Sequence, residues 1–81
     1  MAGYHRREIV KGILGQASKI REEHDEFLDA VEQGNPVMAL LELSDLIGAI
    51  EAYAAGYRMT LAELIRMKDA TRNAFVTGVR K

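Results

Sequence analysis

Apolar residues recur every three or four positions over residues 10–31, the spacing of one face of an α-helix. The pattern predicts an amphipathic helical segment over residues 6–33, preceded by a frayed start at residues 1–5. Gly12 and Gly15 each weaken a helix by roughly 1 kcal/mol relative to Ala. One long helix and two shorter ones therefore both fit this segment.

A second helical pattern, over residues 35–57, is apolar on nearly every side. Asn35 suits the N-cap of this helix and Pro36 its first position, where the missing N–H costs nothing. Gly56 marks its predicted end. Because hardly any side of this helix is polar, we expect it to be buried on several sides.

The connections predict an all-α fold. Gln33–Pro36 is a short turn, which folds the first two helices into an antiparallel hairpin. Thr60 and Glu63 have the spacing of a capping box and open a third helix, predicted to end at Gly78. We expect one domain over residues 1–81, assembled into an oligomeric helix bundle.

Composition narrows the class of protein. An 81-residue chain forms a small core, and 48% apolar residues leave surplus apolar surface, which predicts that the chain pairs with another copy of itself. The net charge of −1 without a massed basic run argues against nucleic-acid binding, and the absence of cysteine excludes thiolate zinc sites. Residues 1–7 lack a signal-peptide core, and acids within residues 37–55 oppose membrane insertion. We expect a soluble, cytoplasmic protein.

Two acids interrupt the apolar second helix. Glu42 and Asp45 are three apart and share a face with Met38 and Ala49. A carboxylate among such neighbours loses hydration unless a cation or donors replace the water. A narrow solvated strip would also accommodate them, but two acids at this spacing favour a bound cation.

The first helix carries a matching pair of acids. Glu22, Glu23, Asp25, Glu26, Asp29 and Glu32 are dense there, and most are expected on a solvated face. Glu23 and Glu26 lie on the flank that a neighbouring helix approaches, and Glu22 with Glu26 is an alternative pair. In a hairpin, Glu26 and Glu42 are each eight residues from Gly34, and Glu23 and Asp45 each eleven. Four carboxylates are therefore predicted to converge.

Oxygen ligands alone favour a hard cation, Mg²⁺ or Mn²⁺. A di-iron centre of the ferritin type requires Glu-x-x-His pairs, which the chain lacks. His24 lies on the apolar stripe and is predicted to be a hydrogen-bonded core residue, and His5 is far off near the terminus. Lys68 and Arg72, four apart on the third helix, suit either a solvated face or phosphate binding.

Glu23-His24-Asp25-Glu26 followed after sixteen residues by Glu42-Leu43-Ser44-Asp45 resembles the signature of the MazG-like, all-α nucleoside triphosphate pyrophosphohydrolases. The third helix, with Lys68, Arg72, Asn73 and Phe75, is also similar to the C-terminal segment of that family. The likeness covers residues 19–80 and resembles the compact forms of the family, some of them phage-encoded.

The resemblance implies Mg²⁺-dependent hydrolysis of a nucleoside triphosphate between its α and β phosphates, in a dimer or a dimer of dimers. It implies that Glu23, Glu26, Glu42 and Asp45 hold the metal. Lys68 and Arg72 would bind phosphate. Apart from the resemblance, Tyr53, Tyr57 and Asn73 are candidates to line a base pocket, although aromatic residues at helix ends also suit a simple core role. Spacing does not identify the general base, and Glu26 is favoured because it is expected nearest the open edge of the cluster. Two alternatives are a phosphoribosyl-ATP pyrophosphatase and a non-catalytic helical dimerisation module.

Overall fold

The computed structural model describes residues 5–77, and side chains for residues 5–73. Over that range the chain forms three helices and no strand: α1 (Ala17–Glu32), α2 (Pro36–Ala55) and α3 (Leu61–Thr77). The predicted all-α class is confirmed. The predicted end at Gly78 lies outside the described residues.

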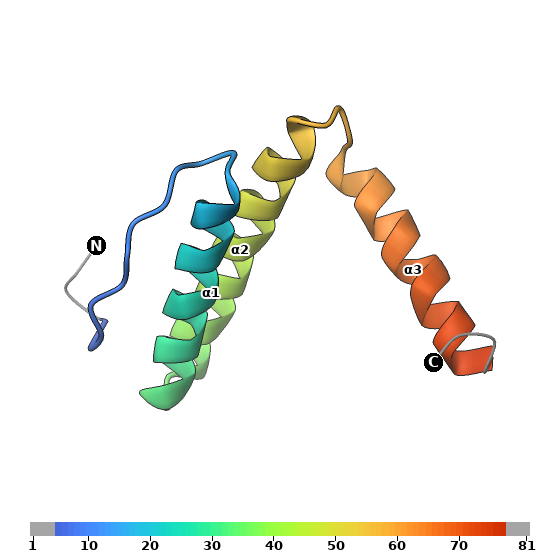
Figure 1. Cartoon of the computed structure of the whole chain (residues 1–81). Helices are drawn as coiled ribbons and strands as arrows, with labels where there is room; N and C mark the ends of the chain where they lie inside the picture. The colour runs from blue at the N-terminus through green and yellow to red at the C-terminus, as the bar shows by residue number, and fades with distance from the viewer. Residues whose placement is uncertain (1–4, 78–81) are drawn as a thin grey trace.

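α1 and α2 lie side by side as an antiparallel hairpin, as predicted (Figure 1). Asn35 caps α2, because its side-chain oxygen accepts a hydrogen bond from the Met38 N–H at 3.0 Å, and Pro36 is the first helical residue. Gly34 takes a left-handed backbone, φ 68°, which a residue with a side chain adopts only at a cost. Gly56 caps the end of α2.

The core between the two helices is small. Ala30, Met38 and Ala39 are buried together with Phe27 packed against them. The opposite side of α2 is open, with Val37 78%, Leu40 67% and Ile47 50% exposed. Burial of α2 on several sides is therefore not achieved within one chain, because α1 covers only one of its faces.

α3 begins at the predicted capping box. The Thr60 N–H donates to the Glu63 carboxylate at 2.8 Å, and the Glu63 N–H donates to the Thr60 hydroxyl at 3.2 Å. α3 touches α2 sparingly, makes no contact with α1 over the described residues, and leads away from the hairpin (Figure 1). The hairpin and α3 thus do not form one closed core.

The segment before α1 differs from the prediction. Residues 5–16 are not helical but run beside α1, so both the long helix and the pair of helices are wrong (Figure 1). Gly15 has φ 94°, and a Cβ added to Gly12 would lie 2.2 Å from the Ser18 carbonyl oxygen. Both glycines therefore lie where the chain reverses direction before α1. The apolar residues of the predicted helical pattern in this segment are exposed: Val10, Ile13 and Leu14.

No helix among the described residues combines the length and the apolar content that crossing a membrane requires.

Candidate metal centre

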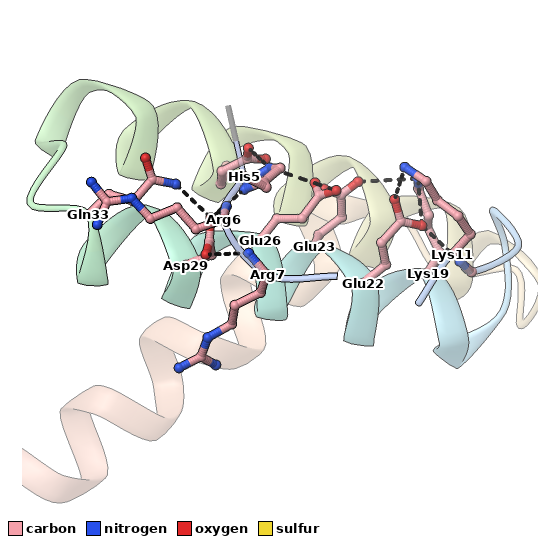
Figure 2. A network of polar contacts seen from close by, with 12 residues as sticks. His5, Arg6, Arg7, Lys11, Lys19, Glu22, Glu23, Glu26, Asp29 and Gln33 are labelled. Carbon is pink, nitrogen blue, oxygen red and sulfur yellow. Dashed lines mark hydrogen bonds and ion pairs between the residues drawn. The ribbon is translucent and has the colours of Figure 1, made fainter. Parts of the chain in front are cut away.

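Five acids are buried where α1, α2 and residues 5–16, hereafter the N-terminal segment, meet. They are Glu22, Glu23, Glu26, Asp29 and Glu42, with exposed fractions between 0% and 8%. The N-terminal segment lies across the acids of α1 (Figure 2). The expected solvated face is therefore wrong for Glu22 and Asp29, because this segment covers them in place of water.

Asp29 is fully compensated. It accepts hydrogen bonds from the backbone N–H groups of Arg6 and Arg7, at 3.2 and 3.3 Å, and from Gln33 at 2.7 Å, and it pairs with Nδ1 of His5 at 2.8 Å. Burial alone would raise the pKa of Asp29, but these hydrogen bonds outweigh it and hold the pKa at about 2, below its usual 3.8. Asp29 therefore anchors the N-terminal segment as a carboxylate.

Glu22 is compensated in the same way. Its carboxylate accepts a hydrogen bond from the Gly12 N–H at 2.8 Å and pairs with Lys19 at 3.2 Å and Lys11 at 3.6 Å. Burial works to raise the pKa of Glu22, but the Gly12 hydrogen bond and the lysine charges lower it below its usual value. Glu22 has a structural role that its surroundings fully explain.

Glu42 and Glu23 lack such compensation. Glu42 is 0% exposed, and over the described residues neither of its oxygens accepts a hydrogen bond. Nε2 of His5 lies 3.0 Å from Oε2 of Glu42, within ion-pair range, but without the alignment of a hydrogen bond. Leaving a buried carboxylate without donors is costly, so this arrangement calls for a ligand.

Within the described part of the chain, Oε1 of the buried Glu23 accepts no hydrogen bond, and Lys19, at 3.3 Å from Oε2, is the one cation paired with it. Burial raises the pKa of Glu23, the hydrogen bond with Glu26 and the charge of Glu26 raise it further, and Lys19 offsets this in part. A metal ion bound between two adjacent carboxylates would relieve their mutual repulsion.

The four predicted acids do come together. Carboxylate oxygens of Glu23, Glu42 and Asp45 lie within 4.8 Å of one another, and Glu26 belongs to two further such groups, one with Glu22 and Glu23 and one with His5 and Glu42. Asp45 is exposed whereas Glu26 is 8% exposed. The prediction that Glu26 lies at the open edge of the cluster is therefore wrong. The N-terminal segment covers Glu26, and Asp45 forms the open edge.

Both histidines differ from their predicted environments. His24 is not a core residue: its side chain is 56% exposed and contacts Asp25 at 3.3 Å, because that side of α1 has no helix against it. His5 is neither frayed nor remote, since its side chain is 5% exposed and lies among the acids (Figure 2). The helix-weakening Gly12 and Gly15 were the available signal that the chain turns back here.

The predicted substrate-binding residues lie on α3, away from the acids of the same chain. Lys68 and Arg72 are exposed, and Lys68 pairs with Asp69 at 2.8 Å. Asn73 is also exposed. Because α3 does not contact α1, one chain does not bring these residues to the acids.

Comparisons of the chain with protein-family models, curated proteins and solved structures gave no match. The interpretation of the site therefore depends on its residues and their geometry.

Proposed function

We propose that this protein is a Mg²⁺-dependent nucleoside triphosphate pyrophosphohydrolase, which cleaves between the α and β phosphates. The observation that carries the proposal is Glu42, fully buried and without a hydrogen-bond donor among the described residues, beside Glu23 and Asp45. The substrate class comes from the resemblance of the two acidic motifs to the MazG-like family.

The residues present fit a hard cation. Glu23, Glu26, Glu42 and Asp45 would hold it, since they supply the carboxylate oxygens that Mg²⁺ and Mn²⁺ prefer. A bound cation would offset the negative charge that develops on the phosphate oxygens. The exposed position of Asp45 leaves one side of the cluster open to a triphosphate.

The remaining chemistry falls to the side chains. An acid of the cluster would orient or deprotonate the attacking water; Glu26 is the predicted general base, and Asp45 is the acid of the cluster at the exposed edge. Asp29 and Glu22 hold that segment in place and take no part in the reaction. Lys68 and Arg72 would neutralise the leaving pyrophosphate, and Asn73 would contact the base.

Bringing the basic residues of α3 to the acids requires a second copy of the chain. The acids and the basic residues of α3 are separated within one chain, and α2 presents an open apolar face. We propose that two chains pair across that face as a homodimer, or as a homotetramer of two such pairs. The cations on α3 of one copy would then serve the acids of another.

The test is a panel of nucleoside triphosphates, with phosphoribosyl-ATP included, assayed for pyrophosphate release with Mg²⁺. We expect Glu42→Gln and Asp45→Asn to reduce turnover to background, and Glu51→Gln, an exposed acid on the same helix, to leave it unchanged. Unchanged turnover in both site variants would reject the site.

The panel also separates the alternatives. Preference for phosphoribosyl-ATP over every triphosphate would identify the phosphoribosyl-ATP pyrophosphatase. If no compound is cleaved and calorimetry shows Mg²⁺ binding equally well to the wild type and to Glu42→Gln, the chain is a non-catalytic dimerisation module.

A further inference from the structure

His5 is held in one orientation at the edge of the acid cluster. Its Nδ1 lies 2.8 Å from Oδ2 of Asp29, and its side chain is 5% exposed. The opposite ring nitrogen, Nε2, then lies 3.0 Å from Oε2 of Glu42 and 3.9 Å from Oε2 of Glu26. The Asp29 carboxylate thus directs the other ring nitrogen toward two further carboxylates.

This is the arrangement that supports a metal-binding histidine. A carboxylate that accepts a hydrogen bond from the Nδ1–H fixes the tautomer, orients the ring and leaves the Nε2 lone pair for a metal. Asp29 suits this task because its carboxylate also accepts hydrogen bonds from the Arg6 and Arg7 N–H groups and from Gln33, which hold it in place.

The distances agree with a shared ion. Around an ion with ligands at about 2.1 Å, adjacent octahedral ligands lie about 3.0 Å apart and opposite ones about 4.2 Å apart. The 3.0 Å and 3.9 Å separations from Nε2 of His5 fall within these limits. The burial of Glu42 points the same way, since it is 0% exposed and its oxygens accept no hydrogen bond from the described residues.

We propose that His5, Glu26 and Glu42 form a second metal position beside the one that Glu23, Glu26, Glu42 and Asp45 would form, with Glu26 and Glu42 shared between the two. Because one ligand is an imidazole nitrogen, this position takes a first-row transition ion such as Mn²⁺, Co²⁺ or Zn²⁺ in preference to Mg²⁺. The inference deepens the proposed function, because it rests on the same metal cluster, but it does not require the hydrolase activity.

The rival explanation is that His5 is a protonated counter-ion, whose positive charge stands in for a metal among the acids. The two explanations differ in the effect of removing the ring. A counter-ion competes with metal, so its loss leaves metal binding equal or tighter. A ligand supports metal, so its loss weakens binding.

The test uses the full chain with metal salts alone, without nucleotide. We expect His5→Ala to weaken Co²⁺ binding, followed by visible absorption, by about tenfold to a hundredfold. Mg²⁺ binding, followed by calorimetry, should change by less than about twofold, since Mg²⁺ favours the oxygen-only position. His24→Ala, at the exposed histidine on α1, is the matched control and should leave Co²⁺ binding unchanged. Equal or tighter Co²⁺ binding by His5→Ala overturns the proposal.

A second measurement needs no variant. Zn²⁺, which is diamagnetic, should shift the Nε2 resonance of His5 in the nitrogen NMR spectrum of the wild type and leave the ring nitrogens of His24 unshifted. An unshifted Nε2 of His5, or an equal shift at His24, overturns the proposal. Because neither experiment measures turnover, an absence of pyrophosphate release would reject the proposed function without deciding this one.

Discussion

Replacing Gly12 with Ala tests whether the N-terminal segment packs against the start of α1. A Cβ at position 12 would lie 2.2 Å from the Ser18 carbonyl oxygen and 2.5 Å from the Lys19 backbone nitrogen, whereas ordinary contact begins at 3.4 Å. These atoms belong to the backbone and have no side-chain rotation to relieve the clash. The segment and α1 must therefore separate by about 1 Å, which packed interfaces do not absorb without loss.

The separation removes two hydrogen bonds. The Gly12 N–H donates to the Glu22 carboxylate at 2.8 Å, and the Ile13 N–H donates to the Ser18 hydroxyl at 3.1 Å. A hydrogen bond to a charged group contributes about 1.5–3 kcal/mol and a neutral one about 0.5–1.5 kcal/mol, so the expected loss is about 2–4 kcal/mol. This loss cannot exceed the free energy that holds the N-terminal segment to α1, because the hairpin can stay folded after the segment detaches.

Hydrogen exchange and trypsin cleavage measure the detachment directly. In Gly12→Ala we expect the amides of Arg7 and Ile13 to exchange faster by about thirtyfold or more, which is what ~2 kcal/mol implies. Cleavage after Arg7 and Lys11 should accelerate in step. Gly15→Ala is the control: it strains a backbone at φ 94° but meets no atom within 4 Å, so the Arg7 amide should stay protected. If Gly12→Ala leaves exchange and cleavage unchanged, the close approach of the segment to α1 is wrong.

Two further changes test the buried acid and the open face. With a chelator present, Glu42→Met should raise the free energy of unfolding by roughly 1–3 kcal/mol, because it removes a buried carboxylate that lacks donors. Denaturant unfolding measures this, and a variant less stable than the wild type would contradict it. Leu40→Glu should shift the protein to a smaller species in sedimentation. Leu40 is 67% exposed in one chain, so we expect the substitution to lower the folding stability of the single chain by less than about 0.5 kcal/mol. If Leu40 is buried between two chains, the substitution should weaken their association by about 2 kcal/mol. An unchanged mass would place the interface elsewhere.

The hairpin was predictable because its signals are local. The Asn35 cap, the Pro36 start and the Thr60–Glu63 capping box each involve residues within a few positions of one another, and all three form. The register of acids across the hairpin followed from equal distances to one turn. Convergence of Glu23, Glu42 and Asp45 therefore needed no knowledge of the rest of the chain.

The N-terminal segment was not predictable by the same means, because its partners lie far along the chain. Helical periodicity continued through Val10 and Ile13, and Gly12 and Gly15 suggested only a local weakness. What holds the segment is contact between Asp29 and backbone groups more than twenty positions earlier. The direction of α3 was missed for a related reason, since a capping box determines where a helix begins but not which surface it contacts.

The acids separate into two kinds by the donors they have. Glu22 and Asp29 are as deeply buried as Glu42, and sequence reasoning placed both on a solvated face, yet lysines, backbone N–H groups and His5 compensate their charge. Glu22 and Asp29 are therefore buried because they hold the N-terminal segment, and their burial does not indicate a ligand. Glu42 sits on an apolar helix, and over the described residues neither of its oxygens accepts a hydrogen bond, since Nε2 of His5 lies 3.0 Å away without the alignment to donate. A buried charge of this kind needs compensation. A cation shared with Glu23 and Asp45 meets that need, and this is why burial together with the lack of donors, and not burial alone, points to the functional acids.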